Sequence, residues 1–569
     1  FPALDWHCSR VEVCRPPDGQ EGAEPETQVF LCDRWLQTAD EDVELRSGKL
    51  CLLQDETEEE LKQQRLRQLQ RQQELIRWRM TVDGVPQCVD LNSVSELGPN
   101  LRYTRKSSGA NLTYLKGFTC RAEAWTNFSE LETVFTHSGH QNSIARFVQT
   151  HILPSNLSVT ANMLRPFLPE GSSLQRELQE GRIYLLDYEV LDGVPANVVN
   201  GKQTYLSAPL CLLHLNQQSQ LVPIAIQLQQ NPGPQNPVFL PSDPGSDWLL
   251  AKIWVRASDF QCHQLVSHYL RTHVIGELCC VATLRQLPDL HPLHQLLMPH
   301  IKTSLQINLQ ARTSLLAADG VFDKAMGSGL KTLPVLLSRA SAKTTYRSLC
   351  IPDDLKDRGL DNLPQSYYAQ DALKVWDALH SFVVSWVNVY YSRDDDVQLD
   401  SELQHWITDI NTHGFTHNSG FPQSFNTKAE VSKFVTMIIF SCSALHSAVN
   451  FSQLDFALWM PNCPVAMLRP PPQVKGGVTE DDILSFLPDV NSTCRVLMTL
   501  EMLSQPAHDS VPLCHYNEAI FADGTHRRLV EEVQAQLAAI SKDIVKRNSR
   551  LELPYPYLCP SHIENSVAI

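Results

Sequence analysis

The segment His263-Gln-Leu-Val-Ser-His268-Tyr-Leu-Arg-Thr-His273 repeats a histidine every five residues within a mostly apolar stretch. Six of the 20 histidines lie between residues 263 and 300, where a uniform spread would place about 1.3, and metal binding is the leading cause of such a concentration. In a regular α-helix a five-residue step turns about 500°, so successive histidines lie about 140° apart and cannot share a metal. A local π-turn with an i→i+5 hydrogen bond returns them to nearly one face. The sequence therefore predicts a π-bulge between His268 and His273, although ordinary hydrogen-bonded helix histidines would be the better interpretation of a single one.

A second pair of candidate ligands lies in the apolar segment 434–451. His446 and Asn450 are four residues apart, so an ordinary α-helix presents both side chains on one face. An imidazole nitrogen and an amide oxygen can both bind a metal, but a buried histidine and asparagine more often satisfy each other's hydrogen bonds. Mixed imidazole and oxygen ligation suits iron, and composition alone leaves zinc, manganese and nickel open.

The composition argues against nucleic acid as a partner and indicates a cellular compartment. The 569 residues carry a net charge of −16 and a pI of about 5.7, which argues against nucleic acid as a partner. The 16 cysteines form no Cys-x-x-Cys pair with a matching second pair, so a reducing, cytoplasmic compartment is expected. No apolar segment with a basic leader follows Phe1, so no secretory signal is expected. Polar residues interrupt the segment 434–451, which is predicted to be too polar to span a membrane, and membrane contact is expected to be peripheral.

Secondary-structure patterns divide the chain into an extended start and a largely helical remainder. Residues 1–48 contain short extended pieces between turns and are predicted to form part of a β domain. Residues 55–80 are rich in Glu, Gln and Arg and predict a long exposed helix, with a calmodulin target as the alternative. Strands are predicted at 183–190, 209–215 and 222–228, and helices at 248–285, 292–317, 368–392, 428–451 and 526–548.

The histidine spacing His263-x4-His268-x4-His273-x17-His291-x8-His300 resembles the signature of the lipoxygenases. Similar passages include Phe239-Leu-Pro-Ser-Asp243, Trp459-Met-Pro-Asn462 and the ending Glu564-Asn-Ser-Val-Ala-Ile569. The resemblance runs over residues 1–569 and is strongest to the branch of animal 15-lipoxygenase type 2 and epidermal lipoxygenases. It implies a mainly α fold, with a large helical lipoxygenase catalytic domain at 49–569 preceded by a partial β-sandwich, a PLAT-like remnant, at 1–48.

The resemblance also assigns the metal ligands. It implies one non-haem iron (Fe) per chain, held by His268, His273, His446, Asn450 and the C-terminal carboxylate of Ile569. His263, His291 and His300 match the histidines that do not bind the metal. The residues that lead to Ile569 would then thread into the helical core, against the ordinary expectation of a frayed chain end.

By resemblance, the residues expected to shape the substrate cavity are Phe260, Ile307, Ala311, Leu315, Ala325 and Met326. Ala311 matches the position where Ala accompanies S-configured and Gly accompanies R-configured product, and Leu315 matches the leucine that braces the pentadiene. Plain core packing is the alternative role of these side chains. Arg312 is expected to form a structural ion pair rather than to bind the substrate carboxylate.

The implied activity is insertion of O2 into polyunsaturated fatty acids, such as arachidonate or linoleate, to give hydroperoxides. No catalytic residue beyond the iron-bound hydroxide is required. Asp455-Phe456 resembles the epidermal type that rearranges hydroperoxides, so a hydroperoxide isomerase is the alternative, and a non-catalytic lipid-binding protein is another. Two departures accompany the resemblance. By resemblance, the β domain is expected to be partial, which would weaken peripheral membrane contact, and a passage near the substrate entrance is expected to be missing between Val148 and Pro154.

Overall fold

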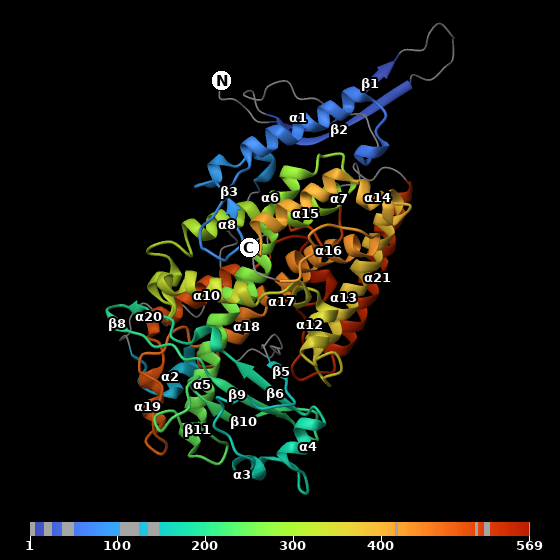
Figure 1. Cartoon of the computed structure of the whole chain (residues 1–569). Coiled ribbons are helices and arrows are strands. Elements are labelled where there is room, and N and C mark those ends of the chain that lie inside the picture. The colour runs from blue at the N-terminus through green and yellow to red at the C-terminus, as the bar shows by residue number, and fades with distance from the viewer. Residues whose placement is uncertain are drawn as a thin grey trace.

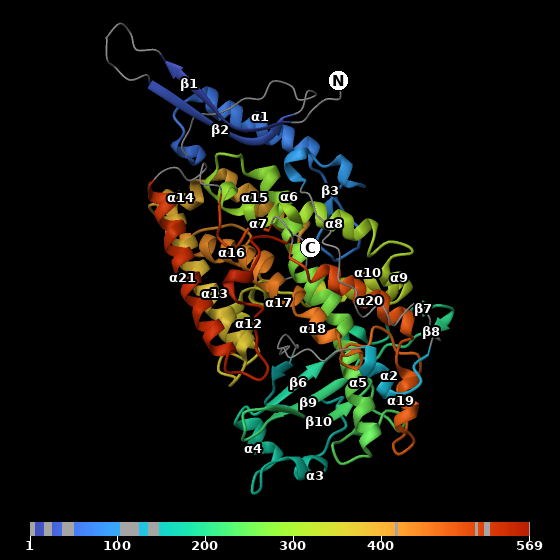
Figure 2. The same ribbon diagram turned by 180° about the vertical axis from the view of Figure 1, so that it is seen from behind.

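The computed structural model describes residues 6–15, 26–36, 50–102, 124–134, 147–415, 419–506, 510–516 and 524–567. Most elements are helices, so the expected mainly α fold is confirmed. The two views in Figures 1 and 2 agree on the order of the parts. β1, β2 and α1 lie at one end, the helical body fills the middle, and a small sheet lies at the other end.

An antiparallel hairpin begins the described chain. β1 (Trp6–Arg15) pairs with β2 (Glu26–Leu36) from Trp6↔Leu36 to Arg15↔Glu26, with an irregularity between Cys8 and Arg10. Both strands are longer than the extended pieces predicted from local residues, because cross-strand pairs stabilise extended backbone beyond the residues that favour it locally. The predicted boundary at residue 48 falls outside the described residues.

The long exposed helix predicted for 55–80 is α1 (Glu59–Leu75), which is shorter. Its one buried residue, Arg65, donates to the Glu402 carboxylate on α15 (Ser401–His413) from Nε at 3.0 Å and from Nη2 at 2.5 Å. A bidentate pair of this kind is geometrically specific as well as charge-assisted. A buried ion pair therefore ties α1 to the helical body.

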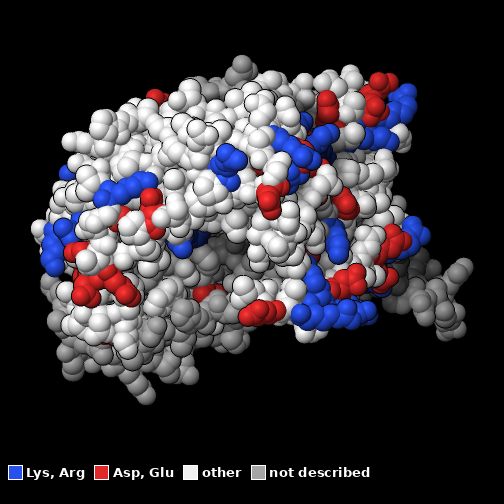
Figure 3. Space-filling model, turned by 90° about the horizontal axis from the view of Figure 1, so that it is seen from below, with Lys and Arg blue, Asp and Glu red and all other residues white. Residues whose placement is uncertain are grey.

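The sheet has five antiparallel strands in the order β11-β10-β9-β6-β5. The three predicted strands are confirmed as β6 (Ile183–Asp187), β9 (Leu210–Leu215) and β10 (Leu221–Gln227). The edges, β5 (Phe147–Gln149) and β11 (Val238–Phe239), are short. Figure 3 views the molecule from the end where this sheet lies in Figure 1, and acidic and basic side chains are interspersed over that face.

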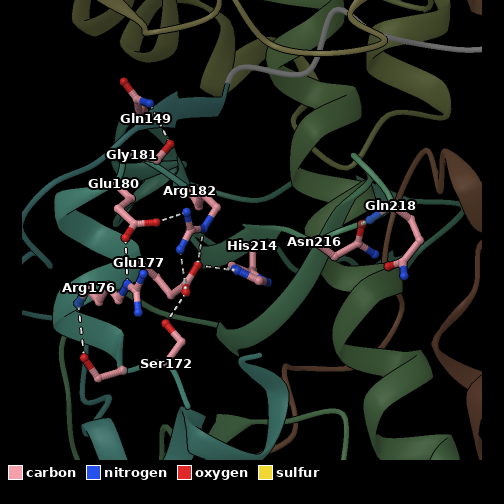
Figure 4. A network of polar contacts seen from close by, with 11 residues as sticks. Gln149, Ser172, Arg176, Glu177, Glu180, Gly181, Arg182, His214, Asn216 and Gln218 are labelled. Atoms are coloured by element: carbon pink, nitrogen blue, oxygen red, sulfur yellow. Dashed lines mark hydrogen bonds and ion pairs between the residues drawn. The ribbon is translucent and has the colours of Figure 1, made fainter. Parts of the chain in front are cut away.

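A buried carboxylate fixes one corner of the sheet. Glu177, on α4 (Leu174–Gln179), accepts from Arg182 Nε at 2.5 Å and Nη2 at 2.8 Å, and from His214 Nε2 at 2.9 Å (Figure 4). These hydrogen bonds, those of Arg182 foremost, lower the pKa of Glu177 to about 2. The charged carboxylate therefore joins α4 to β9 and to the start of β6.

The edge strand β5 continues regularly into the region where the resemblance implies a missing passage. The Gln149 N–H donates to the Arg358 carbonyl at 2.9 Å, and the Thr150 N–H donates to the Ile183 carbonyl at 2.8 Å. Gln149 Nε2 also donates to the Gly181 carbonyl at 2.6 Å (Figure 4). Gly181 has a φ of +69°, and a Cβ there would lie 2.3 Å from Gln149 Nε2. The positive φ favours glycine at position 181, and the missing Cβ leaves room for the Gln149 amide. Residues 149 and 150 are hydrogen-bonded on both sides.

Two composite helices form the centre of the helical body. The first is α5 (Gly245–Cys262), the π-helix η7 (His263–Val274) and α6 (Ile275–Gln286), which follow one another without a break. The second is α16 (Lys428–Phe440), the π-helix η8 (Ser441–Leu445) and α17 (His446–Asn450). The other long helices are α7 (Pro292–Ile301), α8 (Thr303–Thr313), α10 (Gly329–Lys343), α13 (Tyr367–Tyr390), α20 (Val490–Leu503) and α21 (Gly524–Asn548). The five predicted helical segments are confirmed, and α10, α15 and α20 were not predicted.

Among the described residues, one helix, Lys428–Ala457, is long and apolar enough to cross a membrane by length and composition. The helix is apolar enough in spite of its polar residues, so the prediction that the segment 434–451 is too polar to span a membrane was wrong. However, 94% of its apolar stretch is buried inside the protein. A core helix can be equally long and apolar. This helix carries His446 and Asn450 at the centre of the fold.

Candidate metal centre

The π-helix η7 brings His268 and His273 together. It spans 12 residues, so the predicted π-bulge is confirmed and is longer than a single turn. The Thr272 hydroxyl donates to the His268 carbonyl at 2.5 Å, a side-chain bond to the preceding turn that often accompanies a departure from regular helix. With i→i+5 geometry, residues five apart lie on nearly the same face.

His446 begins α17, directly after the second π-helix. This π-helix was not predicted, because the four-residue spacing of His446 and Asn450 needs only an ordinary α-helix. Within η8, the Ser443 hydroxyl donates to the Ile439 carbonyl at 2.6 Å. The structure thus uses one π-helix on each of the two facing segments.

Three imidazoles converge in a space closed to solvent. His268, His273 and His446 are buried, and each contributes a ring nitrogen that lies within 4.8 Å of the other two. Their ring centroids are 4.9, 5.2 and 5.1 Å apart, and the Nε2 atoms of His268 and His273 are 3.2 Å apart. Three ring nitrogens that converge within this distance could bind one metal ion together.

Burial keeps the imidazoles of His268 and His273 neutral. It lowers the pKa of His268 well below the ordinary value, and the neighbouring rings of His273 and His446 add to the effect. Burial also lowers the pKa of His273 to about 4, against the opposing hydrogen bond with Asn308. Neutral imidazole is the form that binds metals. At pH 7 these two rings therefore offer lone pairs rather than positive charges.

Asn308, on α8, determines the tautomer of His273. Its Nδ2 donates to the His273 carbonyl at 2.8 Å and to Glu277 Oε2 at 2.7 Å. Since both acceptors require the amide nitrogen, Oδ1 must be the atom that lies 2.9 Å from His273 Nδ1, and an amide oxygen only accepts. His273 Nδ1 therefore carries the proton, and Nε2 presents its lone pair to the cluster.

Glu277 and Arg312 hold Asn308 in this orientation. Arg312 donates to both Glu277 carboxylate oxygens, at 2.7 and 2.9 Å, and the Val89 N–H donates to Oε1 at 3.1 Å. The expected structural ion pair of Arg312 is confirmed. Burial lowers the pKa of Arg312, but the Glu277 charge outweighs it and raises that pKa above the ordinary value. A chain of contacts thus runs from Arg312 through Glu277 and Asn308 to His273.

Asn450 is buried one turn after His446. Its Nδ2 donates to the Leu503 carbonyl at 2.7 Å, which orients the amide and leaves Oδ1 as the acceptor. Gln453 Nε2 donates to that Oδ1 at 2.7 Å, and Gln264 Nε2 donates to Gln453 Oε1 at 3.0 Å. These amides link η7 to the end of α17. The Asn450 oxygen keeps a second lone pair, as a metal ligand needs.

The C-terminal segment enters the helical body. Residues Glu564 to Val567 are buried, and the Thr303 hydroxyl donates to the Val567 carbonyl at 2.7 Å. Ile569 lies outside the described residues, so ligation by its carboxylate stays a prediction. Two residues of extended chain reach at most about 7 Å beyond Val567.

The six residues expected to shape the substrate cavity lie in or beside the core. Phe260, on α5, and Ile307, on α8, belong to the same apolar core as Ala325 and Met326, which follow α9 (Val321–Lys324). Ala311 is buried on α8, and Leu315, beyond the end of α8, is partly exposed. Burial fits a cavity wall and plain packing equally, so these assignments stay predictions.

Two further histidines of the signature have structural partners. His263 Nδ1 contacts Gln264 Nε2 at 3.1 Å. His291 Nδ1 accepts from the Leu293 N–H at the start of α7, and its Nε2 donates to Asp400 Oδ2 at 3.1 Å. His291, Asp400 and Glu402 also have ligand atoms within 4.8 Å of one another. Because Arg65 already pairs with Glu402, this second group is a buried polar contact rather than a metal site.

Several residues of the site were missed in the sequence. Glu277 lies one turn after His273, Gln264 lies four residues before His268, and Gln453 lies three after Asn450. A search for polar residues at helical spacing from each predicted ligand would have found them. Asn308 carries no such signal.

The fold and the site define a mainly helical domain around a buried histidine cluster that could hold a metal ion. Residues 144–555 match the family described as Lipoxygenase. The chain belongs to the lipoxygenase family.

Similar proteins agree over nearly the whole chain. The polyunsaturated fatty acid lipoxygenase ALOX15B of Rattus norvegicus is 38% identical over 605 aligned positions, which cover 100% of this chain and 88% of the relative. ALOX8 of Mus musculus is 40% identical over 95% of this chain and 85% of its own length. The hydroperoxide isomerase ALOXE3 of Homo sapiens is 38% identical over 100% and 89%. The 605 positions exceed the 569 residues of this chain, so the chain lacks segments that ALOX15B has.

Solved structures show the same fold. A calcium-dependent 11R-lipoxygenase superposes with a TM-score of 0.92 at 28% identity, covering 99% of this chain and 88% of the other. The coral 8R-lipoxygenase superposes with a TM-score of 0.91 at 30% identity, with the same coverage.

Proposed function

We propose that this chain is an iron-dependent dioxygenase that inserts O2 into polyunsaturated fatty acids to give hydroperoxides. The observation that carries the proposal is the buried cluster of His268, His273 and His446 in a lipoxygenase chain. The substrate class is supported by relatives named polyunsaturated fatty acid lipoxygenases. A lipoxygenase in complex with arachidonate is also a structural neighbour, with a TM-score of 0.90.

His268, His273, His446, Asn450 and the Ile569 carboxylate would hold the iron. When bound, the metal would supply one-electron redox chemistry for oxidation of a doubly allylic CH2 group. Three neutral imidazoles and one amide add no charge, so a single carboxylate would offset only part of the charge of the ion. Nitrogen and oxygen donors of this kind suit iron.

The protein contributes orientation and exclusion of water. Asn308 fixes the lone pair of His273, and the amides of Gln453 and Gln264 fix Asn450. The core around the cluster is apolar, which keeps water away from a radical intermediate of the substrate. The cavity residues Phe260, Ile307, Ala311, Leu315, Ala325 and Met326 would place the pentadiene against the metal.

A hydroperoxide isomerase is the second candidate, because ALOXE3 of Homo sapiens is as similar to this chain as ALOX15B of Rattus norvegicus. The two residues that carry this likeness in the sequence have structural partners. Asp455 accepts from the Tyr557 hydroxyl at 2.7 Å, and the Arg256 guanidinium lies 4.1 Å from the centre of the Phe456 ring. A non-catalytic lipid-binding protein is the third candidate.

One set of measurements separates the three. The purified full chain is assayed for iron per chain, for O2 uptake with arachidonate, and for loss of an added fatty acid hydroperoxide. O2 uptake supports the dioxygenase, loss of hydroperoxide without uptake supports the isomerase, and bound lipid with neither activity supports the binding protein. His446→Ala should lose iron and activity together. His294→Ala, which removes another buried histidine outside the cluster, should keep both.

We also propose a cytoplasmic location with peripheral membrane contact. Cys279, Cys280 and Cys442 are buried thiols that form no disulfide, which suits a reducing compartment. Cell fractionation with and without added lipid vesicles tests both parts.

A further inference from the structure

A short loop pairs with the end of the described chain. Pro512 forms an antiparallel bridge with Glu564. The Leu513 N–H donates to the Ile563 carbonyl at 3.0 Å, and the Asn565 N–H donates to the Val511 carbonyl at 2.7 Å. The buried C-terminal segment, residues 563–567, therefore runs beside the loop 511–516 as a short strand.

Asn565 also joins the loop through its side chain. The Cys514 N–H donates to Asn565 Oδ1 at 2.9 Å, and Asn565 Nδ2 donates to the His515 carbonyl at 3.1 Å. Cys514 has a φ of +58°, an uncommon conformation for a residue other than glycine that persists where surrounding contacts determine it. The loop is thus shaped around this one asparagine.

His300 connects the segment and the loop from the opposite side. It is completely buried on α7, with Nδ1 2.8 Å from the Asn565 carbonyl and Nε2 2.8 Å from the Tyr516 hydroxyl. A carbonyl only accepts, so Nδ1 carries the proton. Burial lowers the pKa of His300 to about 4, so the ring is neutral and Nε2 accepts from Tyr516. One ring holds both partners.

We propose that His300 is a positioning residue that clamps the C-terminal segment into the helical body, together with Thr303 and the loop 511–516. Thr303, at the start of α8, donates to the Val567 carbonyl at 2.7 Å. The same helix carries Asn308, which contacts His273. The junction of α7 and α8 therefore sets the position of residues 563–567 relative to the histidine cluster. The clamp holds the backbone of the segment, so it goes beyond the proposed function and acts whatever the terminal carboxylate binds.

Hydrogen–deuterium exchange of the full chain, before and after chelation of metal, tests the clamp. The amides of Leu513, Cys514 and Asn565 report on it, because each donates a hydrogen bond between loop and segment. They should be protected even in the metal-free protein. His300→Leu should speed their exchange at least about tenfold, since two buried hydrogen bonds are lost. It should also speed release of the last residues by a carboxypeptidase.

His294→Leu is the matched control, because His294 is another buried histidine on α7 but bonds the Leu287 carbonyl instead of the segment. It should leave the three amides protected. His300→Asn, whose amide can still donate to the Asn565 carbonyl, should restore part of the protection.

Unchanged exchange in His300→Leu, or equal acceleration in His294→Leu, would overturn the clamp. Rapid exchange of these amides in the metal-free parent would also overturn it. If His300→Leu does not fold, Tyr516→Phe removes one hydroxyl and must still speed exchange at the same amides. A parent chain that binds no iron but keeps these amides protected would refute the proposed function alone, so the two failures are distinguishable.

Discussion

Replacing Asn308 by leucine should weaken metal binding without unfolding the protein. The substitution removes the acceptor 2.9 Å from His273 Nδ1 and two donated hydrogen bonds, to the His273 carbonyl and to Glu277. His273 can then place its proton on either ring nitrogen, and the tautomer with Nε2 protonated cannot bind the metal. Loss of such a partner to a ligand histidine typically costs about 10- to 100-fold in metal affinity. That range equals about 1.4–2.8 kcal/mol.

Asn236→Leu provides the matched control for loss of a buried asparagine. Asn236 also makes three hydrogen bonds, with the Gln229 N–H, the Gln229 carbonyl and the Asn231 carbonyl, and it lies near the sheet. Both substitutions should destabilise the fold by a similar amount, about 1–3 kcal/mol. Anaerobic titration of Fe²⁺ against a competing chelator measures the affinity, and urea unfolding measures the stability. If both variants bind Fe²⁺ as tightly as the parent, the claim that Asn308 keeps the proton on Nδ1 of His273 is refuted.

Three further predictions concern the ion pairs and the cavity. Arg65→Ala should lower the free energy of unfolding in urea by about 3–5 kcal/mol, because it leaves the buried Glu402 charge unpaired. The double variant Arg65→Met with Glu402→Leu should recover most of this stability. A double variant as unstable as Arg65→Ala would contradict the role of the unpaired charge. The pKa of Glu177 is lowered from 4.5 to about 2, so the stability that its charge provides is present above pH 4.5 and is lost as the pH falls towards 2. Arg182→Gln should therefore move the midpoint of acid unfolding, measured by circular dichroism, to higher pH. An unchanged midpoint would contradict this role of Arg182. Ala311→Gly should shift the product from S towards R on chiral chromatography, and an unchanged S product removes Ala311 from the specificity argument.

Local spacing made the central elements predictable. The five-residue interval between His268 and His273 inside one apolar segment is compatible with a shared metal only if the helix is locally of the π type. Residues 403, 406, 407 and 410 of α15 have helical spacing too, so this helix was predictable, although it was not predicted. These signals lie within a few residues of one another, where periodicity determines which side chains share a face.

Contacts between distant helices could not be predicted in the same way. Asn308 is 35 residues from His273, Asn565 is 265 residues from His300, and Glu402 is 337 residues from Arg65. Each partner is an ordinary polar residue whose role depends on how whole helices pack. Such pairings follow from tertiary structure, and a single sequence carries no pattern that specifies them.

The second π-helix explains why the apolar pattern of α16 does not predict the direction in which the His446 side chain points. Each residue of an α-helix advances about 100° around the axis, and a π segment accommodates an extra residue without breaking the helix. η8 ends directly before His446, so α17 is rotated relative to α16 by an amount that the residues of α16 do not encode. The spacing of His446 and Asn450 places them on one face, but the turn before them decides that this face points at His268 and His273. The histidine cluster therefore depends on two irregular helices: η7 brings His268 and His273 onto one face, and η8 turns His446 towards them.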